Sequence, residues 1–544
     1  MQGDSDVIFR NNLAAVGAAL AATVSVHSPS AQARLDDGVE PTASVCQADG
    51  RWVRLHSARD PVAEADRLIA PLFSGEPPPT VVVIGVGLGF VLDAIERRSP
   101  GTRVLALEPI PDIVGLMLRR KDWRPWFASG RLMLLAGPEY LGWNDAWSLI
   151  DARRPSPPVV VHPVVAREFS QATSLARNVA HRVVDGARAN ANAKKAFAPR
   201  YLINTLSNLA GIATEASVDA LRGKFEGVPA IVAAAGPSLD RNIEDLKAME
   251  FRGLLVAVDT AVRPLLTAGL QPQVVVGVDP SDENGRHLMD LPPNRGVFLV
   301  GEGSLAAFVI PAFAGRAFVF RVSDHHPWPW IRTHSLDCGS LRAWGSVLTT
   351  AFDFAVFAGC DPIVFIGADL AYTNDLVYCW NTTYEPRWAA EGRMAIFERH
   401  FRERPPVVAT DLHGNPTMSA AHLMQFRDWL VQRASAETGR RIVNATGDGL
   451  LYGGRIQQAA LSSLSRPGSP VAAGATWRVT ADAWRVSATA RRSAAVGSWS
   501  TLIGQGGAGL PLDDWREFTD GAVATEAITA ALGTAESQWD LVRE

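Results

Sequence analysis

The chain has 544 residues, too many for one compact core, so two or three domains are expected. Its 47% hydrophobic and 20% charged residues are typical of a soluble α/β protein, and a net charge of −4 argues against nucleic acid as a partner. The four cysteines lack metal-ligand spacing, and no apolar stretch reaches the roughly 20 residues that span a bilayer. These features predict a cytoplasmic protein without a membrane span or a bound metal.

The first predicted region covers residues 1–205 and contains a βαβ pattern. A strand is expected over residues 80–84, a helix over 90–98 and a second strand over 103–107. Residues 175–215 look helical and bridge to the next region. We therefore expect an α/β amino-terminal domain with a Rossmann-like unit.

A glycine-rich loop, Gly85 to Gly89, follows the first of these strands, and Glu108 ends the second. Glycines that allow close approach and a carboxylate that can bond ribose suit a nucleotide. However, Phe90 replaces the third glycine of the dinucleotide pattern, and Val83 stands where S-adenosylmethionine sites usually carry an acid. We interpret the loop as a tight turn without a ligand.

The second region, residues 206–465, alternates strands and helices, and a helical third region follows over residues 466–544. Short runs rich in Val and Ile, bounded by Gly, Asp and Pro, are typical of buried parallel strands. The expected strands are 230–235, 254–258, 274–278, 297–300, 317–322, 363–366 and 441–444. This pattern predicts a doubly wound, Rossmann-like α/β domain with ligands at the carboxyl ends of its strands.

A second glycine-containing loop, Gly236-Pro237-Ser238-Leu239, joins a strand to a helix. Gly236 permits close approach of the backbone, and Ser238 can cap the helix. Free N–H groups at the helix start would receive a phosphate. A plain capped turn would explain the loop equally well, but other polar residues also end strands in this region, and we favour nucleotide binding.

Three aspartates end apolar strands of the second region, namely Asp259, which Thr260 follows, Asp279 and Asp369. A doubly wound sheet would gather them near the Gly236 loop. A carboxylate at a strand end can bind ribose, bind Mg²⁺ or act as a base. Single aspartates often cap helices, but three together favour a site.

Further candidates lie between and beyond these strands. Gly345 and Ser346 open an apolar helix that would face the same cleft, although capping alone also explains Ser346. Tyr372 and Tyr378 stand six residues apart after Asp369, where phenol hydroxyls can donate to a departing phosphate or simply pack in a loop. The histidines, His413 among them, lack metal spacing, and the sequence does not choose a general base among them.

In their order, these motifs resemble the MptE-like domain of motility-associated glycosyltransferases. The resemblance rests on residues 231–239, 259–260, 278–280, 345–347, 367–371, 411–415 and 444–447. The segment Leu55–Pro61 and the Gly85 loop are similar to the amino-terminal domain of that family. The central domain also resembles bacterial sialyltransferases with a GT-A-type fold and CMP-activated donors.

The resemblance implies a cytoplasmic bacterial enzyme that needs no cofactor or metal. It would move a nonulosonic acid (pseudaminic, legionaminic or sialic-acid-like) from a CMP-activated donor to Ser or Thr of flagellin. The implied roles are CMP binding by Gly236, Pro237, Ser238 and Leu239; positioning of ribose or sugar by Asp259, Thr260 and Asp279; binding of the sugar carboxylate by Gly345 and Ser346; stabilisation of the phosphate by Tyr372 and Tyr378; and acceptance of the proton by Asp369 or His413.

Two other functions fit the same residues. The first is a diphosphokinase acting on 6-hydroxymethylpterin, as in archaeal MptE enzymes, with Asp259, Asp279 and Asp369 holding Mg²⁺. The second is a flagellin-binding chaperone without catalytic activity, because the histidine that often follows the Asp369 segment in the motility family is absent here.

Overall fold

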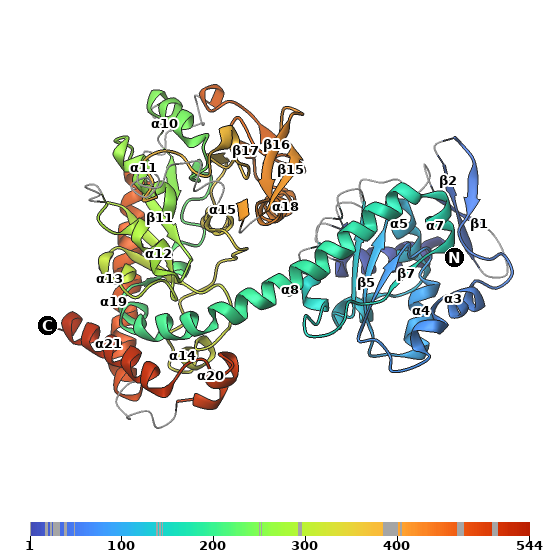
Figure 1. The fold of residues 1–544 in the computed structure, drawn as a ribbon, viewed down its shortest axis with the longest axis horizontal. Coiled ribbons are helices and arrows are strands. Elements are labelled where there is room, and N and C mark those ends of the chain that lie inside the picture. The colour runs from blue at the N-terminus through green and yellow to red at the C-terminus, as the bar shows by residue number, and fades with distance from the viewer. Residues whose placement is uncertain are drawn as a thin grey trace. The chain divides into compact units, whose positions relative to one another are not determined.

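The computed structural model describes residues 2–16, 20–21, 24, 33–36, 41–47, 49–137, 140, 143, 145–249, 251, 253–291, 296–384, 401–402, 405–464, 473–502 and 510–543. The chain forms two compact units, Met1–Lys194 and Lys195–Glu544 (Figure 1). The division falls within α8 (Ser170–Ser207), in the segment predicted to be a helical bridge. Within the described ranges, no helix is both long enough and apolar enough to cross a membrane.

A four-stranded parallel sheet lies at the centre of the first unit. Its order is β6-β5-β4-β7, with β4 (Thr80–Ile84), β5 (Arg103–Glu108), β6 (Leu132–Ala136) and β7 (Val159–Val161). The predicted βαβ pattern is confirmed, since β4, α4 (Phe90–Arg98) and β5 follow one another. The other elements of this unit are α1 (Gln2–Ala15), β1 (Ala33–Asp36), β2 (Thr42–Cys46), β3 (Trp52–Arg54), α3 (Pro61–Ile69), η1 (Ala70–Phe73), α5 (Pro111–Arg120), α6 (Arg124–Ala128), η2 (Asp145–Leu149) and α7 (Pro163–Glu168).

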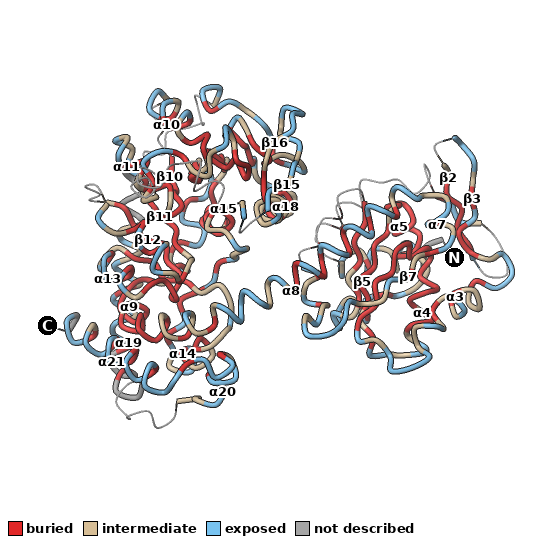
Figure 2. The backbone as a smooth tube through the Cα atoms, viewed as in Figure 1, coloured by how far each residue is buried: buried red, intermediate tan, exposed pale blue. Residues whose placement is uncertain are grey.

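A nine-stranded parallel sheet is the core of the second unit. Its order is β18-β17-β14-β9-β10-β11-β12-β13-β8. The strands are β8 (Ala216–Ser217), β9 (Ala230–Ala233), β10 (Leu254–Val258), β11 (Val274–Gly277), β12 (Phe298–Glu302), β13 (Ala317–Phe320), β14 (Ile363–Ile366), β17 (Ile442–Asn444) and β18 (Gln457–Gln458). The apolar runs of the inner strands are buried, as expected for a parallel sheet covered on both faces (Figure 2).

The strand order reverses direction at β9. From β9 the chain moves outward through β10, β11, β12 and β13, and then returns to place β14 on the other side of β9. The carboxyl ends of β9 and β14 therefore flank the topological switch point, where open α/β sheets hold their ligands.

The predicted α/β class with parallel sheets is confirmed. All seven strands expected in the central region occur, as β9 to β14 and β17, with ends that differ by at most two residues. The sequence reasoning missed the short edge strands β8 and β18 and the antiparallel hairpin of β15 (Pro406–Thr410) and β16 (Pro416–Ala420). The hairpin lacks a buried apolar run, because every second residue of β15 is exposed.

The carboxyl-terminal helices share the core of the second unit. They are α19 (Ala473–Leu502), α20 (Leu512–Phe518) and α21 (Thr525–Arg543). Trp499 of α19 stacks on Trp539 of α21 at 4.1 Å, and Trp484 of α19 donates a hydrogen bond to Glu215, beside β8. The predicted helical region is therefore helical and packs against the edge of the large sheet (Figure 1).

The remaining elements of the second unit connect the strands. They are α9 (Leu209–Thr214), η3 (Val218–Leu221), α10 (Leu239–Ala248), α11 (Asp259–Thr267), α12 (Asp282–Gly285), η4 (Arg286–Leu288), α13 (Val309–Ala312), α14 (Trp328–Thr333), α15 (Val347–Ala358), η5 (Thr373–Asp375), α18 (Ala421–Ala436) and η6 (Leu461–Leu464).

Candidate functional site

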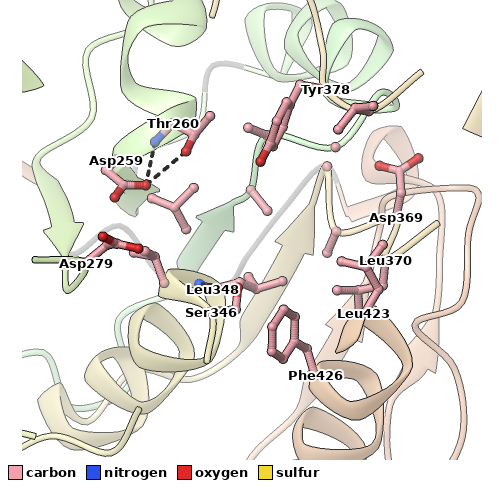
Figure 3. A pocket seen from close by; sticks show the side chains of 18 of the residues that line it. Asp259, Thr260, Asp279, Ser346, Leu348, Asp369, Leu370, Tyr378, Leu423 and Phe426 are labelled. Atoms are coloured by element: carbon pink, nitrogen blue, oxygen red, sulfur yellow. Dashed lines mark hydrogen bonds between the residues drawn. The ribbon is translucent and has the colours of Figure 1, made fainter. Parts of the chain in front are cut away.

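A cleft of about 1050 Å³ opens at the carboxyl ends of β9, β10, β11 and β14 in the second unit (Figure 3). This is the switch point of the sheet, and the volume is slightly larger than the roughly 300–1,000 Å³ that is typical of small-molecule sites. The structure brings eight of the thirteen predicted site residues to its walls: Gly236, Asp259, Thr260, Asp279, Gly345, Ser346, Asp369 and Tyr378. The walls also contain residues that the sequence reasoning did not single out, including Ser281, Glu283, Asn284, Tyr384, His422 and Phe426.

Gly236 and Asp369 meet at the switch point. A Cβ atom at position 236 would collide with the Asp369 carboxylate and with the carbonyl oxygen of Gly367. Gly236 is therefore required because the end of β14 approaches the loop after β9 closely. The close approach predicted at Gly236 is present, but the atoms that come close belong to Asp369 and Gly367 and not to a ligand.

Asp369 fastens the same loop through hydrogen bonds. Its carboxylate accepts the backbone N–H of Ser238, with both oxygens within 3.3 Å, and the Ser238 hydroxyl at 2.7 Å. The side chain is 1% exposed, and burial raises the pKa of Asp369, against the lowering effect of these hydrogen bonds. The arrangement gives Asp369 a positioning function in this structure.

The N–H groups of the Gly236 loop are engaged within the protein. Gly236 donates to Gly367, Ser238 to Asp369, and Leu239 back to Gly236, while Pro237 has no N–H group. Pro237, Ser238 and Leu239 do not line the cleft, and Leu239 is buried in the core. In this conformation the loop shapes the floor of the cleft rather than offering free donors to a phosphate.

Asp259 and Thr260 begin α11 at the end of β10. One oxygen of Asp259 accepts the Thr260 N–H at 2.7 Å and the Thr260 hydroxyl at 3.0 Å (Figure 3). Burial raises the pKa of Asp259 to about 7, and the neighbouring Asp279 adds to the shift. Asp279 itself accepts the Ser281 N–H at 2.8 Å. The cleft thus holds a carboxyl group that changes its charge near neutral pH.

The amino terminus of α15 also points into the cleft. Gly345, Ser346, Val347 and Leu348 all line it, and the Ser346 hydroxyl caps the helix by accepting the Leu348 N–H. Gly345 has φ of +67°, and a Cβ there would collide with Phe426 of α18. The twelve-residue helix directs its positive end at the cleft, which favours an anionic group there.

The two predicted tyrosines are separated in the structure. Tyr378 lines the cleft, whereas Tyr372 is buried outside it, with its ring packed edge-on against Phe401. Tyr384 takes the place beside Tyr378, and their rings stack at 5.1 Å with an interplanar angle of 12°. The residues that face the cleft together are therefore Tyr378 and Tyr384, which also stand six residues apart.

His413 lies in the loop between β15 and β16, outside the cleft wall. Its Nε2 atom is 3.0 Å from the carbonyl oxygen of Gly447, and half of its side chain is exposed. His422, at the start of α18, does line the cleft and packs edge-on against Phe426. No spacing signal in the sequence distinguishes His422 from the other histidines, so it could not have been chosen in advance.

The cleft is rich in carboxylates. Asp259, Asp279, Glu283 and Asp369 line it, and none of its described lining residues is Lys or Arg. Across the described part of the chain, no three His, Cys, Asp or Glu side chains are grouped closely enough to hold a metal ion. Magnesium held by one or two carboxylates together with substrate phosphates needs no such group.

The glycine-rich loop of the first unit is filled from within. Cβ atoms at Gly85, Gly87 and Gly89 would collide with His162 and Val165, with His56 and with Trp123, respectively. The His56 Nε2 accepts the Leu88 N–H at 2.9 Å, and burial lowers the pKa of His56 to about 3, so the ring is neutral.

Glu108 completes this packing at the end of β5. Its buried carboxyl accepts the N–H groups of Val86 and Gly87, and burial raises the pKa of Glu108 to about 7. The loop and the acid that would hold a nucleotide in a Rossmann site are thus bonded to each other and covered by His56. That this loop binds no ligand stays a prediction, and the packing supplies a physical reason for it.

Comparison with known proteins bears on the second unit. Residues 203–375 match the family model described as 6-hydroxymethylpterin diphosphokinase MptE-like. The chain contains an MptE-like domain. The match covers α9 to η5 and includes Gly236, Asp259, Asp279 and Asp369 at the cleft, so the predicted resemblance to this domain is confirmed.

Two further similarities accompany this domain. The chain is 29% identical over 202 residues to an uncharacterized protein of Treponema pallidum, covering 36% of this chain and 67% of that protein. It is also similar to a solved structure of the MAf glycosyltransferase from Magnetospirillum magneticum, with a TM-score of 0.46 and 15% identity over 99% of this chain and 94% of the other.

Proposed function

We propose that the second unit is a glycosyltransferase that moves a nonulosonic acid from a CMP-activated donor to Ser or Thr of flagellin in the cytoplasm. The observation that carries the proposal is the cleft at the switch point of an MptE-like domain, lined by carboxylates and by neutral hydroxyl donors. Carboxylates suit the many hydroxyl groups of a ribose and a sugar. The choice of donor and acceptor rests on the order of the motifs that resemble motility-associated glycosyltransferases.

The donor would lie between α15 and the strand ends. The positive end of α15, at Ser346, suits the negative charge of the donor's phosphate or of its sugar carboxylate. Asp279 and Thr260, which also line the cleft, would bind ribose or sugar hydroxyls. Tyr378 would donate a hydrogen bond to the departing phosphate, whose negative charge grows as the bond to the sugar breaks.

The acceptor hydroxyl must lose a proton during transfer. Asp259 suits this step because it lines the cleft and its pKa of about 7 lets a carboxylate accept a proton near neutral pH. The two bases predicted from the sequence are less favourable. Both carboxylate oxygens of Asp369 accept hydrogen bonds from Ser238, whereas the bonds from Thr260 go to one oxygen of Asp259. His413 does not line the cleft.

A binding screen tests the proposal at its first step. The protein is heated with CMP, CTP, ATP or S-adenosylmethionine, and a ligand that binds the folded state raises the apparent melting temperature. We expect CMP and CTP to stabilise the protein and S-adenosylmethionine to have no effect. Stabilisation by none of the four would remove the transferase proposal and favour a flagellin-binding chaperone.

Diphosphate transfer is the second candidate, because the matched family model carries the description of a diphosphokinase. Asp259, Asp279 and Asp369 are oxygen ligands of the kind that Mg²⁺ prefers, and a substrate diphosphate would supply the remaining ligands. This function predicts stabilisation by ATP only when Mg²⁺ is present. Strict dependence on ATP and Mg²⁺, with no effect of CMP, would place diphosphate transfer first.

A further inference from the structure

The side chain of Asn204, on α8, joins the ends of two neighbouring strands of the large sheet. Its Nδ2 atom donates hydrogen bonds to the carbonyl oxygen of Pro280 at 2.8 Å and to that of Ser304 at 2.9 Å. Pro280 follows β11, and Ser304 follows β12. A side-chain amide has two N–H groups, so these two bonds use both of them. We call the two bonds the clamp.

The clamp acts on a turn that forms part of the cleft wall. Pro280 is buried and stands between Asp279 and Ser281, which both line the cleft. Within the turn, the Ser281 N–H donates to the Asp279 carboxylate at 2.8 Å. A buried backbone carbonyl needs a hydrogen-bond partner, and Asn204 supplies one to Pro280. Asn204 does not itself line the cleft, so it holds this turn from outside the wall.

The position of Asp279 matters because several titratable groups surround its carboxylate. Burial is the largest cause of the pKa shift at four groups, and the charge of Asp279 acts on all of them: Asp259 of α11, Tyr201 of α8, His287 of η4 and Tyr384. Glu283 of α12 adds a second negative charge at His287 and Tyr384. At Asp259, burial and then Asp279 raise the pKa to about 7. A displacement of Asp279 would therefore change the proton affinity of Asp259.

We propose that Asn204 is a positioning residue whose clamp fixes the turn of residues 279–281 and thereby keeps the Asp279 carboxylate in the cleft. The inference rests on the proposed glycosyl transfer, in which Asp279 binds a hydroxyl group of the CMP-activated donor. Without the clamp, the Pro280 carbonyl loses its partner and the turn is free to move toward water. The sugar donor then loses a contact, and Asp259 loses a neighbouring negative charge. In this way α8 shapes the donor site although Asn204 lies outside its wall.

Asn208, one turn further along α8, supplies a matched control. Its Nδ2 atom donates to the carbonyl oxygens of Gly303 at 3.0 Å and of Leu305 at 2.7 Å. Both carbonyls flank Ser304, so Asn208 makes the same kind of contact with the segment after β12 but none of these bonds reaches the Asp279 turn. Asn204→Leu and Asn208→Leu each remove two N–H groups, and urea unfolding should show both variants to be less stable than the wild type. If Asn204→Leu does not fold, Asn204→Ser takes its place.

The activity test uses the full-length protein, recombinant flagellin and three sugar donors: CMP-pseudaminic acid, CMP-legionaminic acid and CMP-N-acetylneuraminic acid. In Asn204→Leu, KM for the sugar donor should rise roughly tenfold with a smaller change in kcat, as expected for a lost binding contact. The pH at which kcat/KM reaches half of its maximum, about 7 in the wild type, should fall because Asp259 holds its proton less tightly. Asn208→Leu should keep the KM and the pH midpoint of the wild type, and Asn204→Gln, which keeps the amide, should lie closer to the wild type than Asn204→Leu.

A double-mutant cycle tests whether Asn204 acts through Asp279. Asp279→Asn removes the charge and should lower the same pH midpoint. The double variant Asn204→Leu with Asp279→Asn should lower it no further than Asp279→Asn alone. Additive shifts in the double variant, or an equal shift in Asn208→Leu, would mean that Asn204 supports the fold in general, and either result would overturn the proposal.

A measurement without activity separates this inference from the proposed function. The proton on Asp259 makes the free energy of unfolding fall as the pH rises between 3.8 and about 7, and this fall should be smaller in Asn204→Leu than in Asn208→Leu. If the wild type transfers none of the sugar donors, the proposed function is overturned, and an equal fall in the two variants would overturn the clamp as well. An active wild type whose KM and pH midpoint are unchanged in Asn204→Leu would overturn this inference alone.

Discussion

Replacing Gly236 by alanine tests how tightly the switch point is packed. The added methyl group would collide with the Asp369 carboxylate and with the carbonyl of Gly367. Overpacking of this kind costs about 1–3 kcal/mol. If Asp369 moves away, its hydrogen bonds to Ser238 weaken, and a hydrogen bond to a charged group contributes about 1.5–3 kcal/mol. We therefore expect a total loss of about 3 kcal/mol in the free energy of unfolding.

The matched control is Gly439→Ala, where the new methyl group would meet nothing within 4 Å. Urea unfolding compares the two variants, and hydrogen exchange of peptides that contain residues 236–239 and 367–369 locates the change. Calorimetry with CMP should report binding that is weakened at least about tenfold in Gly236→Ala, because the floor of the cleft moves; this corresponds to about 1.4 kcal/mol. Equal stability and equal CMP affinity in the two variants would refute the close contact and its importance.

Three further predictions concern single groups. Burial raises the pKa of Asp259 from 3.8 to about 7, so the folded protein binds this proton more tightly than the unfolded chain. The free energy of unfolding should therefore fall as the pH rises between these two pKa values. Asp259→Asn should remove this pH dependence from urea unfolding measured at several pH values, and an unchanged dependence would contradict the pKa shift. If Asp259 is the base, kcat/KM of the wild type should rise as the pH passes about 7, and a flat profile would exclude that role. Gly87→Ala should destabilise the first unit, because the φ of Gly87 is +54° and the added methyl group would meet His56. Calorimetry of the wild-type protein with S-adenosylmethionine should give no heat of binding. A cofactor bound at this loop would show that His56 moves aside. Tyr378→Phe should lower kcat about 100-fold with little change in CMP affinity, and steady-state kinetics with an unaltered kcat would remove Tyr378 from the mechanism.

The inner strands could be predicted because they are short runs of Val, Ile, Leu and Ala bounded by Gly, Asp or Pro. The gathering of Gly236, Asp259, Asp279 and Asp369 could also be predicted, since parallel strands bring their carboxyl ends to one edge. This rule depends only on strand direction and order. It does not say which atoms touch, so the bond between Asp369 and Ser238 could not be foreseen.

The remaining differences arise from contacts between segments far apart in the sequence. Tyr384, rather than Tyr372, is the neighbour of Tyr378, and this position depends on contacts with His287: the ring of Tyr384 packs on it, and Thr383 makes a hydrogen bond with it across 96 residues of sequence. Similarly, the Gly85 loop is filled by His56, which no local spacing connects to it. Local patterns describe elements and their ends, whereas these contacts depend on the paths of the loops.

The most direct test of the proposed function is the mass of intact flagellin after incubation with the protein and a CMP-activated nonulosonic acid. The proposed glycosyl transfer predicts a mass increase of one or more nonulosonic acid residues on Ser or Thr, with one CMP released for each sugar transferred. Flagellin of unchanged mass with every CMP donor, together with Mg²⁺-dependent transfer of diphosphate from ATP to 6-hydroxymethylpterin, would contradict it.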